Sequence, residues 1–352
     1  MRTSLSLTLA AFALGCSSTT TTPPDAAVDG PVDSARDAAT DGAADAGDGA
    51  SCVVGSSNDP LVVATDRGLV RGAMEGDAIH WLGVPYAAPP VGALRWRPPQ
   101  NPACWSDARD ATMWAPACPQ IPQQQGQTFD PMAPMVGQED CLTLNVWRPA
   151  SAPTDAALPV MVFVHGGGNV VGSANERTQA GVALFDATRL AARGNVVVVT
   201  LQYRLGPLGW LSHPTLDAEA GSAPAGNLAL LDQVAALRWV QRNVRAFRGD
   251  PTRVLLFGES AGAVNTCALL ASPAAQGLFQ RALIESGSCT ATQSLTDARN
   301  QTQRFLEGAG CAVASDTLAC LRGLSAEAVV RALPAPVNVS GLDPNAVRWG
   351  PV

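Results

Sequence analysis

The feature that most constrains the fold is a serine between two glycines, placed where a strand gives way to a helix. Residues 258–262 read Gly-Glu-Ser-Ala-Gly, directly after the apolar run 254–257, and a helical pattern continues over 263–270. A tight strand-to-helix turn would force the serine into a strained backbone conformation with its hydroxyl exposed. A Cβ on Gly258 or Gly262 would then collide with neighbouring backbone. The pattern therefore predicts a nucleophilic serine, Ser260, rather than a serine in an ordinary loop.

A second glycine-rich segment follows another apolar run. Residues 159–164 are typical of a buried strand, and residues 165–168 (His-Gly-Gly-Gly) come directly after it. Glycines let backbone N–H groups approach a substrate, and such groups stabilise negative charge on a carbonyl oxygen during acyl transfer. The predicted donors are the N–H groups of Gly167, Gly168 and Ala261. The alternatives are a plain flexible loop and a phosphate cradle, although a cradle would need a helix N-terminus and a nearby Lys-Ser/Thr pair.

Apolar runs alternate with helical patterns from residue 159 onward. Buried strands are expected at 159–164, 195–203, 254–257 and 282–284, and a helix is expected at 226–247. This alternation indicates an α/β fold with a mostly parallel central sheet and helices on both faces. No second globular domain is expected.

The first 58 residues differ in composition from the rest. Residues 1–16 hold a short apolar run that ends at Gly15-Cys16, which is too short to span a bilayer and resembles a lipoprotein-type signal peptide. Cys16 would then carry a lipid anchor, in a protein exported to the outer membrane or cell surface. Secretion without an anchor and a cytosolic location are the alternatives. Residues 17–58 predict an Asp/Ala-rich disordered tether, because aspartates four residues apart would repel one another on a helix.

The negative charge of the chain is concentrated in this tether. Residues 17–51 contain seven aspartates and one arginine, which accounts for six of the seven units of the net charge of −7. The remainder is nearly neutral, so no nucleic-acid partner is expected, and membrane contact is expected only through Cys16. A hydrophobic content of 47% is typical of a globular protein, which here would occupy residues 59–352.

Eight cysteines follow Cys16, and disulfides are allowed in an exported protein. Cys311 and Cys320 are close in sequence and are predicted to pair. Cys104 and Cys118 form a second predicted pair. No Cys-x-x-Cys or His-rich spacing predicts a zinc site, and neither a metal nor a cofactor is expected. The cysteines that remain unassigned are Cys52, Cys141, Cys267 and Cys289.

Further motifs follow one another along the chain. They are Leu-Gly-Val-Pro-Tyr-Ala at 82–87, Leu-Arg-Trp-Arg-Pro-Pro at 94–99, Glu-Asp-Cys-Leu-Thr-Leu-Asn-Val at 139–146, Tyr-Arg-Leu-Gly at 203–206 and Gly-Asp-Pro at 249–251. In this order, and ahead of Gly-Glu-Ser-Ala-Gly, they resemble the type-B carboxylesterase/lipase family, which includes the cholinesterases. The resemblance runs from about residue 60 to residue 352. It implies the α/β-hydrolase fold, with Ser260 forming an acyl-enzyme and Gly167, Gly168 and Ala261 forming the oxyanion hole.

The resemblance also implies a serine carboxylic ester hydrolase that acts on a small-molecule ester. Such an enzyme needs a histidine base oriented by a carboxylate, and in this family both follow the serine. His80, His165 and His213 all precede Ser260. We therefore expect the domain over residues 59–352 to be incomplete, with the C-terminal part of the fold and the rest of the triad beyond Val352, and little turnover. The alternatives are a non-catalytic binding protein on the same scaffold and a non-functional fragment.

Two positions depart from the family pattern. Asn169 stands where an aromatic residue is usual, which bears on the shape of the acyl pocket. Arg248 replaces a usual glycine and is expected to be structural. Because aromatic residues make up only 5% of the chain, a cation-binding aromatic gorge has little support, and a generic ester of modest acyl size is expected.

Overall fold

The structure is a computed structural model that describes residues 52, 54–123, 129–178, 180–221, 226–334 and 347–352. The predicted signal peptide over 1–16, and the predicted tether as far as residue 51, lie outside the described residues. Within the described ranges, no helix has the length and apolar character needed to cross a membrane.

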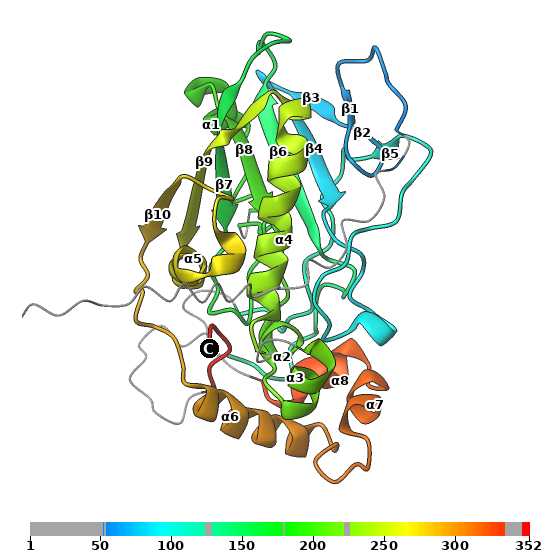
Figure 1. The fold of residues 1–352 in the computed structure, drawn as a ribbon, viewed down its shortest axis with the longest axis vertical. Helices are drawn as coiled ribbons and strands as arrows, with labels where there is room; N and C mark the ends of the chain where they lie inside the picture. The colour runs from blue at the N-terminus through cyan, green and yellow to red at the C-terminus, as the bar shows by residue number, and fades with distance from the viewer. Residues whose placement is uncertain (1–51, 53, 124–128, 179, 222–225, 335–346) are drawn as a thin grey trace, which may run out of the picture. The chain divides into compact units, whose positions relative to one another are not determined.

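A seven-stranded sheet forms the centre of the domain (Figure 1). In spatial order its strands are β10 (Arg281–Glu285), β9 (Gly249–Glu259), β7 (Leu158–Val164), β8 (Val197–Leu201), β6 (Thr143–Pro149), β4 (Ala78–Pro85) and β3 (Ala73–Glu75). The strands β10, β9, β7 and β8 run parallel, as predicted from residue 159 onward. The strands β6, β4 and β3 continue the sheet antiparallel, so the whole sheet is mixed.

The parallel strand β8 is buried on both faces, which is why it appears as a continuous apolar run in the sequence. On β8, Val197 and Val199 face the main core, whereas Val198 packs with Trp147 in a second cluster on the other face. Helix α1 (Thr188–Gly194) covers that second cluster through Ala191. The helices α4 (Leu228–Asn243) and α5 (Ala261–Ala271) cover the main core (Figure 1).

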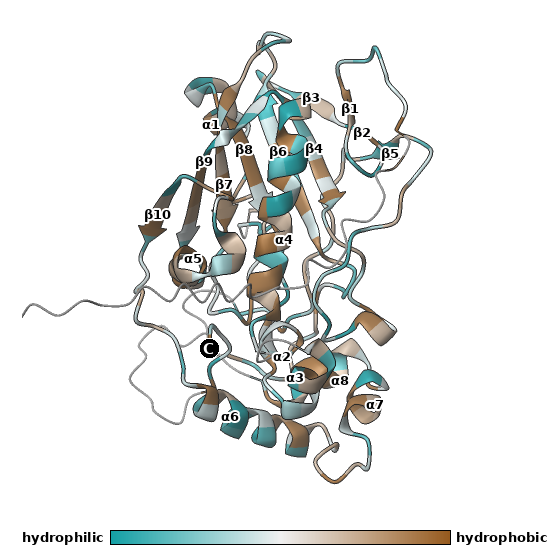
Figure 2. Cartoon of the chain, in the orientation of Figure 1, coloured by the Kyte–Doolittle hydropathy of each residue, from teal (hydrophilic) through white to brown (hydrophobic). Residues whose placement is uncertain are grey.

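The remaining helices gather beyond the end of the sheet where β7 and β9 stop (Figure 1). They are α2 (Gly206–Trp210), α3 (Pro214–Ala220), α6 (Leu295–Gly308), α7 (Thr317–Arg322) and α8 (Ala326–Ala332). Figure 2 shows α5 and the neighbouring strands as mostly apolar, whereas α6 alternates between polar and apolar residues along its length. The alternation is that of an amphipathic helix, since α6 buries one side, which includes Phe305 and Leu306. The predicted helix at 226–247 is present as α4 followed by a 3₁₀ turn.

A separate small sheet is formed by β1 (Val62–Ala64), β2 (Leu69–Arg71) and β5 (Arg109–Asp110). The described residues contain four disulfides: Cys52–Cys104, Cys118–Cys141, Cys267–Cys289 and Cys311–Cys320. The predicted Cys311–Cys320 pair is confirmed.

The predicted Cys104–Cys118 pair is wrong. Between these two cysteines the chain passes from the small sheet, where β5 pairs with β2, to the main sheet, where Ala115 packs against Gly83 of β4. Proximity in sequence therefore does not bring the two sulfur atoms together. Each pairs instead with a cysteine in its own layer: Cys104 with Cys52 and Cys118 with Cys141.

Candidate active site

Ser260 stands at the turn between β9 and α5. Its backbone has φ 55° and ψ −119°, a combination that residues with a Cβ rarely adopt. The Ser260 N–H donates a hydrogen bond of 2.8 Å to the carbonyl of Glu285 at the end of β10. The strained turn is thus held by two strands of the sheet, and the serine side chain remains partly exposed.

The two flanking glycines have no room for a side chain. A Cβ on Gly258 would lie 2.2 Å from the carbonyl oxygen of Gly262, and a Cβ on Gly262 would lie 2.1 Å from that of Val164. The steric reason predicted for both glycines is therefore confirmed. As a result, the first turn of α5 lies in backbone contact with the end of β7.

The glycine loop leaves β7 and passes beside the serine. A Cβ on Gly166 would lie 3.0 Å from the Cβ of Ser260, so this backbone touches the nucleophile turn. Gly167 and Gly168 have φ values of 102° and 62°, which favour glycine. Within the ranges that the structure describes, the N–H groups of Gly167, Gly168 and Ala261 donate no hydrogen bond. Three unpaired donors therefore belong to the two segments that meet at Ser260.

His165 supports this loop and is not placed as a base. Its buried ring stacks on Tyr203, with ring centroids 4.4 Å apart, and its Nδ1–H donates to the Gly166 carbonyl over 2.9 Å. The Tyr203 hydroxyl in turn donates to the His165 carbonyl over 2.8 Å. Burial lowers the pKa of His165 to about 4, so the ring is neutral near pH 7.

The other two histidines are also occupied elsewhere. His213 accepts a hydrogen bond from the Thr215 N–H and caps α3, and burial lowers its pKa. His80 lies on β4, with Nδ1 3.2 Å from a carboxylate oxygen of Glu75. All three histidines of the chain are described, and none hydrogen-bonds to Ser260.

A group of carboxylates next to the serine was not singled out from the sequence. Burial raises the pKa of Glu259, and the nearby charge of Glu285 raises it further. Burial likewise raises the pKa of Glu176, with a contribution from Glu259. Glu259 directly precedes Ser260, and this position is the one sequence signal that points to it. Glu176 has no such signal, because only the fold brings it near Glu259.

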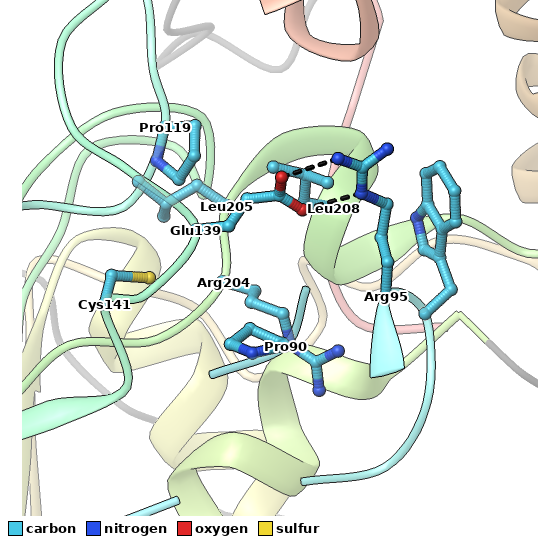
Figure 3. Close-up of a pocket in the computed structure, with 9 residues that line it drawn as sticks. Pro90, Arg95, Pro119, Glu139, Cys141, Arg204, Leu205 and Leu208 are labelled. Carbon is cyan, nitrogen blue, oxygen red and sulfur yellow. Dashed lines mark hydrogen bonds and ion pairs between the residues drawn. The ribbon is translucent and has the colours of Figure 1, made fainter. Parts of the chain in front are cut away.

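One pocket, shown in Figure 3, contains a buried ion pair. Arg95 binds Glu139 through two hydrogen bonds of 2.7 and 2.6 Å, and its remaining nitrogen donates to carbonyls at the end of α7, including that of Leu324 over 2.7 Å. Arg204, also at this pocket, is paired with buried Asp232 over 2.7 Å. Because these charges are satisfied within the protein, the pocket serves the packing of loops and is not the candidate site.

A second pocket lies beside the glycine loop and is largely apolar. Val170, two residues after Gly168, lines it together with Leu205 and Gly206. Its other walls come from Pro119, Ile121 and Phe129, from the end of α8 and from Trp349. The hollow next to the predicted oxyanion loop is therefore walled mostly by apolar residues.

A strained serine turn between a parallel strand and a helix, faced by a glycine loop from the adjacent strand, defines the α/β-hydrolase class. The model of the carboxylesterase family matches residues 59–352. Para-nitrobenzyl esterase of Bacillus subtilis is 41% identical over 271 residues, which cover 77% of this chain and 52% of that protein. Fumonisin B1 esterase of Sphingopyxis macrogoltabida is 45% identical over 235 residues, which cover 66% and 41%.

Solved structures agree. A carboxylesterase of Geobacillus stearothermophilus superposes with a TM-score of 0.67 at 38% identity, over 83% of this chain and 55% of that one. This chain therefore belongs to the carboxylesterase family, and the predicted α/β-hydrolase fold is confirmed. The chain spans about half the length of the curated relatives it matches.

Proposed function

We propose that this protein hydrolyses carboxylic esters of small molecules through an acyl-enzyme on Ser260. The observation that carries the proposal is the meeting of the strained Ser260 turn with the loop of Gly167 and Gly168, whose N–H groups are unpaired within the described part of the chain. The names of the relatives, which are esterases, support the same reaction class.

In the proposed reaction, the Ser260 hydroxyl oxygen attacks the ester carbonyl while its proton passes to a base. The N–H groups of Gly167, Gly168 and Ala261 stabilise the tetrahedral oxyanion, and each such donor is typically worth about 2.7–4 kcal/mol of barrier. The carbon–oxygen bond then breaks, the alcohol leaves with the proton, and water releases the acid in a second step.

The base is proposed to be a histidine outside residues 1–352. This proposal follows from the positions of His80, His165 and His213, each of which is held in another contact. The chain alone should then retain only residual catalysis, of about 10³–10⁴-fold over water, from its oxyanion donors and substrate binding.

The substrate is proposed to carry an acyl or alcohol group of modest size that enters the apolar pocket beside Val170. Apolar walls from Leu205 and Trp349 favour a hydrocarbon group over a charged one.

The experiment uses the purified chain with p-nitrophenyl acetate and added imidazole as an external base. We expect slow release of p-nitrophenol that imidazole accelerates, and mass spectrometry should find the acetyl group on the peptide that contains Ser260. Ser260→Ala should remove the acetylated peptide and lower p-nitrophenol release to the rate of imidazole and buffer without protein. Acetylation elsewhere, or no acetylation, would overturn the proposal in favour of a binding protein or a non-functional fragment. Turnover at ordinary esterase rates without imidazole would refute the external base.

We also propose that the protein is exported and anchored by lipid on Cys16. Four disulfides among the described residues support an oxidising compartment. Expression with radiolabelled palmitate should label the protein, and Cys16→Ala should abolish the label. An unlabelled but processed and secreted protein would favour secretion without an anchor.

A further inference from the structure

A buried pair of amide side chains joins the glycine loop to the nucleophile helix. Asn169 comes directly after the predicted oxyanion glycines and is 4% exposed, and Asn265 lies on α5 and is fully buried. The Asn265 amide nitrogen donates to the Asn169 side-chain oxygen over 2.9 Å, and a longer contact of 3.4 Å runs in the reverse direction.

The two residues hold the two segments that carry the oxyanion donors. Asn169 is bonded directly to Gly168. Asn265 lies four residues after Ala261, on the same face of α5. The amide pair therefore connects the donor on the loop to the donor on the helix over a short path. The Asn169 carbonyl also accepts a hydrogen bond of 2.7 Å from the Gly206 N–H, which fixes the loop from its other side.

The choice of asparagine has a physical reason at each position. Asn169 has φ 58°, a left-handed conformation that asparagine tolerates better than most residues with a Cβ. A buried amide without a partner is costly, and here each amide supplies a partner for the other. Replacing either asparagine would leave the amide of the other buried without its partner, so the two positions act as one unit.

We infer that Asn169 and Asn265 are positioning residues, which hold the oxyanion donors of Gly167, Gly168 and Ala261 in register around Ser260. The inference rests on the proposed function, because it assigns the pair to the geometry of that oxyanion hole. Neither amide hydrogen-bonds to Ser260, so the pair acts through the loop and the helix. Its loss should therefore slow acylation while leaving substrate binding nearly unchanged.

The test compares Asn265→Ala with the wild-type chain in imidazole-assisted acetylation of Ser260. Asn265→Ala leaves the loop sequence unchanged, including Asn169 at its left-handed position. We expect the maximal acylation rate to fall about tenfold or more, as a partial loss of oxyanion donors, with the half-saturating ester concentration within about threefold. Glycine also tolerates φ 58° at position 169, so Asn169→Gly should lower the maximal acylation rate by a similar factor. The double variant should be no slower than the worse single variant, because both substitutions break one interaction.

Asn243→Ala is the matched control, because Asn243 is a buried asparagine on α4 that hydrogen-bonds to Asp66, away from Ser260. It should lower the melting temperature and leave acylation at the wild-type rate. Amide hydrogen exchange supplies a readout that does not depend on chemistry: Asn265→Ala should speed exchange in the segment 166–171.

The outcomes separate the two proposals. If wild-type Ser260 is never acetylated, the proposed function fails, and the exchange measurement still decides whether the pair orders the loop. If wild-type Ser260 is acetylated and Asn265→Ala reacts at the same rate, the positioning inference is overturned. Unchanged exchange at 166–171 in Asn265→Ala overturns it as well.

Discussion

Gly262 shows how little freedom a single residue has at this site. Because Gly262 has no Cβ, α5 can pack directly against the carbonyl of Val164. A Cβ at this position would lie 2.1 Å from that carbonyl oxygen. We predict that Gly262→Ala destabilises the domain by about 3 kcal/mol or more, since backbone on both sides must move. Gly323→Ala is the control, because the nearest atoms there lie at an ordinary 3.4 Å. Urea unfolding should show a large shift for the first variant and a shift within about 0.5 kcal/mol for the second. Equal shifts would contradict the steric argument.

His165 makes a prediction about pH. Its pKa is about 4 in the folded protein and near 6.5 in an unfolded chain, so the unfolded state binds the proton more readily between these values. The contribution of His165 to stability is therefore complete above pH 6.5 and is lost as the pH falls toward 4. Linkage puts the loss at about 3 kcal/mol.

The variant His165→Phe isolates this effect, because phenylalanine can stack on Tyr203 but does not titrate. The wild-type chain should lose more unfolding free energy between pH 7 and pH 4.5 than the variant, by about 2–3 kcal/mol. Other acidic groups titrate in both proteins and cancel in the difference. Parallel pH profiles would show that the ring is protonated without penalty.

At this scale the sequence predicted the strained serine and its glycines, because the local pattern alone determines them. It did not predict Asn265 as a partner of Asn169. The two positions are 96 residues apart, and only the meeting of α5 with the loop after β7 brings them together. An asparagine inside a helix pattern gives no sign of whether its amide faces solvent or a buried partner.

At the scale of elements, disulfide Cys267–Cys289 attaches α5 to the chain just beyond β10. Glu285, the last residue of β10, accepts the Ser260 N–H through its carbonyl, and a Cβ on Gly287, just beyond β10, would lie 3.0 Å from the Ser260 carbonyl oxygen. The disulfide thus links the two backbone segments that flank the nucleophile turn.

We predict that replacing Cys267 and Cys289 by alanine costs more stability than replacing Cys311 and Cys320. Loop-closure entropy gives about 3.4 kcal/mol for the first separation of 22 residues and about 2.6 kcal/mol for the second of 9. Only the first pair should also speed hydrogen exchange at Ser260 and its neighbours. Calorimetry and hydrogen exchange on the two double variants check both statements. Faster exchange at Ser260 in the control, or in neither variant, would refute the local role.

The failed Cys104–Cys118 prediction belongs to this scale. Sequence separation ranks cysteine pairs correctly only when the intervening chain stays in one layer, as it does from α6 to α7 for Cys311 and Cys320. Between Cys104 and Cys118 the chain changes sheets, and that change depends on the strand pairing of β5 with β2. The strand β5 has only two residues, Arg109–Asp110, which is too short for a sequence pattern to predict this change of sheet.

Across the whole molecule, the half of the sheet that the sequence predicted is the half with continuous apolar strands. The strands β4 and β6 escaped prediction as strands because they bury polar residues: His80 on β4, and Asn145 and Arg148 on β6. Asn145 is satisfied by the N–H of Gly83 and by the hydroxyl of Thr200, which come from neighbouring strands. Such partners exist only in the assembled sheet, so the sequence pattern resembles neither an alternating nor a fully apolar strand.

The two edges of this sheet differ, and the difference predicts how the chain behaves in solution. Among the described residues β10 pairs only with β9, and its central Leu283 is 45% exposed. The opposite edge, β3, has only three residues, although Met74 on it is 62% exposed. A longer apolar edge strand is a template for pairing with another chain, whereas a very short one is a poor template.

We therefore predict that the chain of residues 1–352 self-associates through β10. Leu283→Lys should shift it toward the monomer, because a charge on the exposed face of an edge strand opposes pairing between copies. Met74→Lys adds the same charge at the other edge and should leave association unchanged. Sedimentation velocity over a range of concentrations measures both variants against the wild-type chain. If Met74→Lys dissociates the chains as well as Leu283→Lys does, net charge and not the β10 edge controls association. If neither variant has an effect, the edge is not the contact.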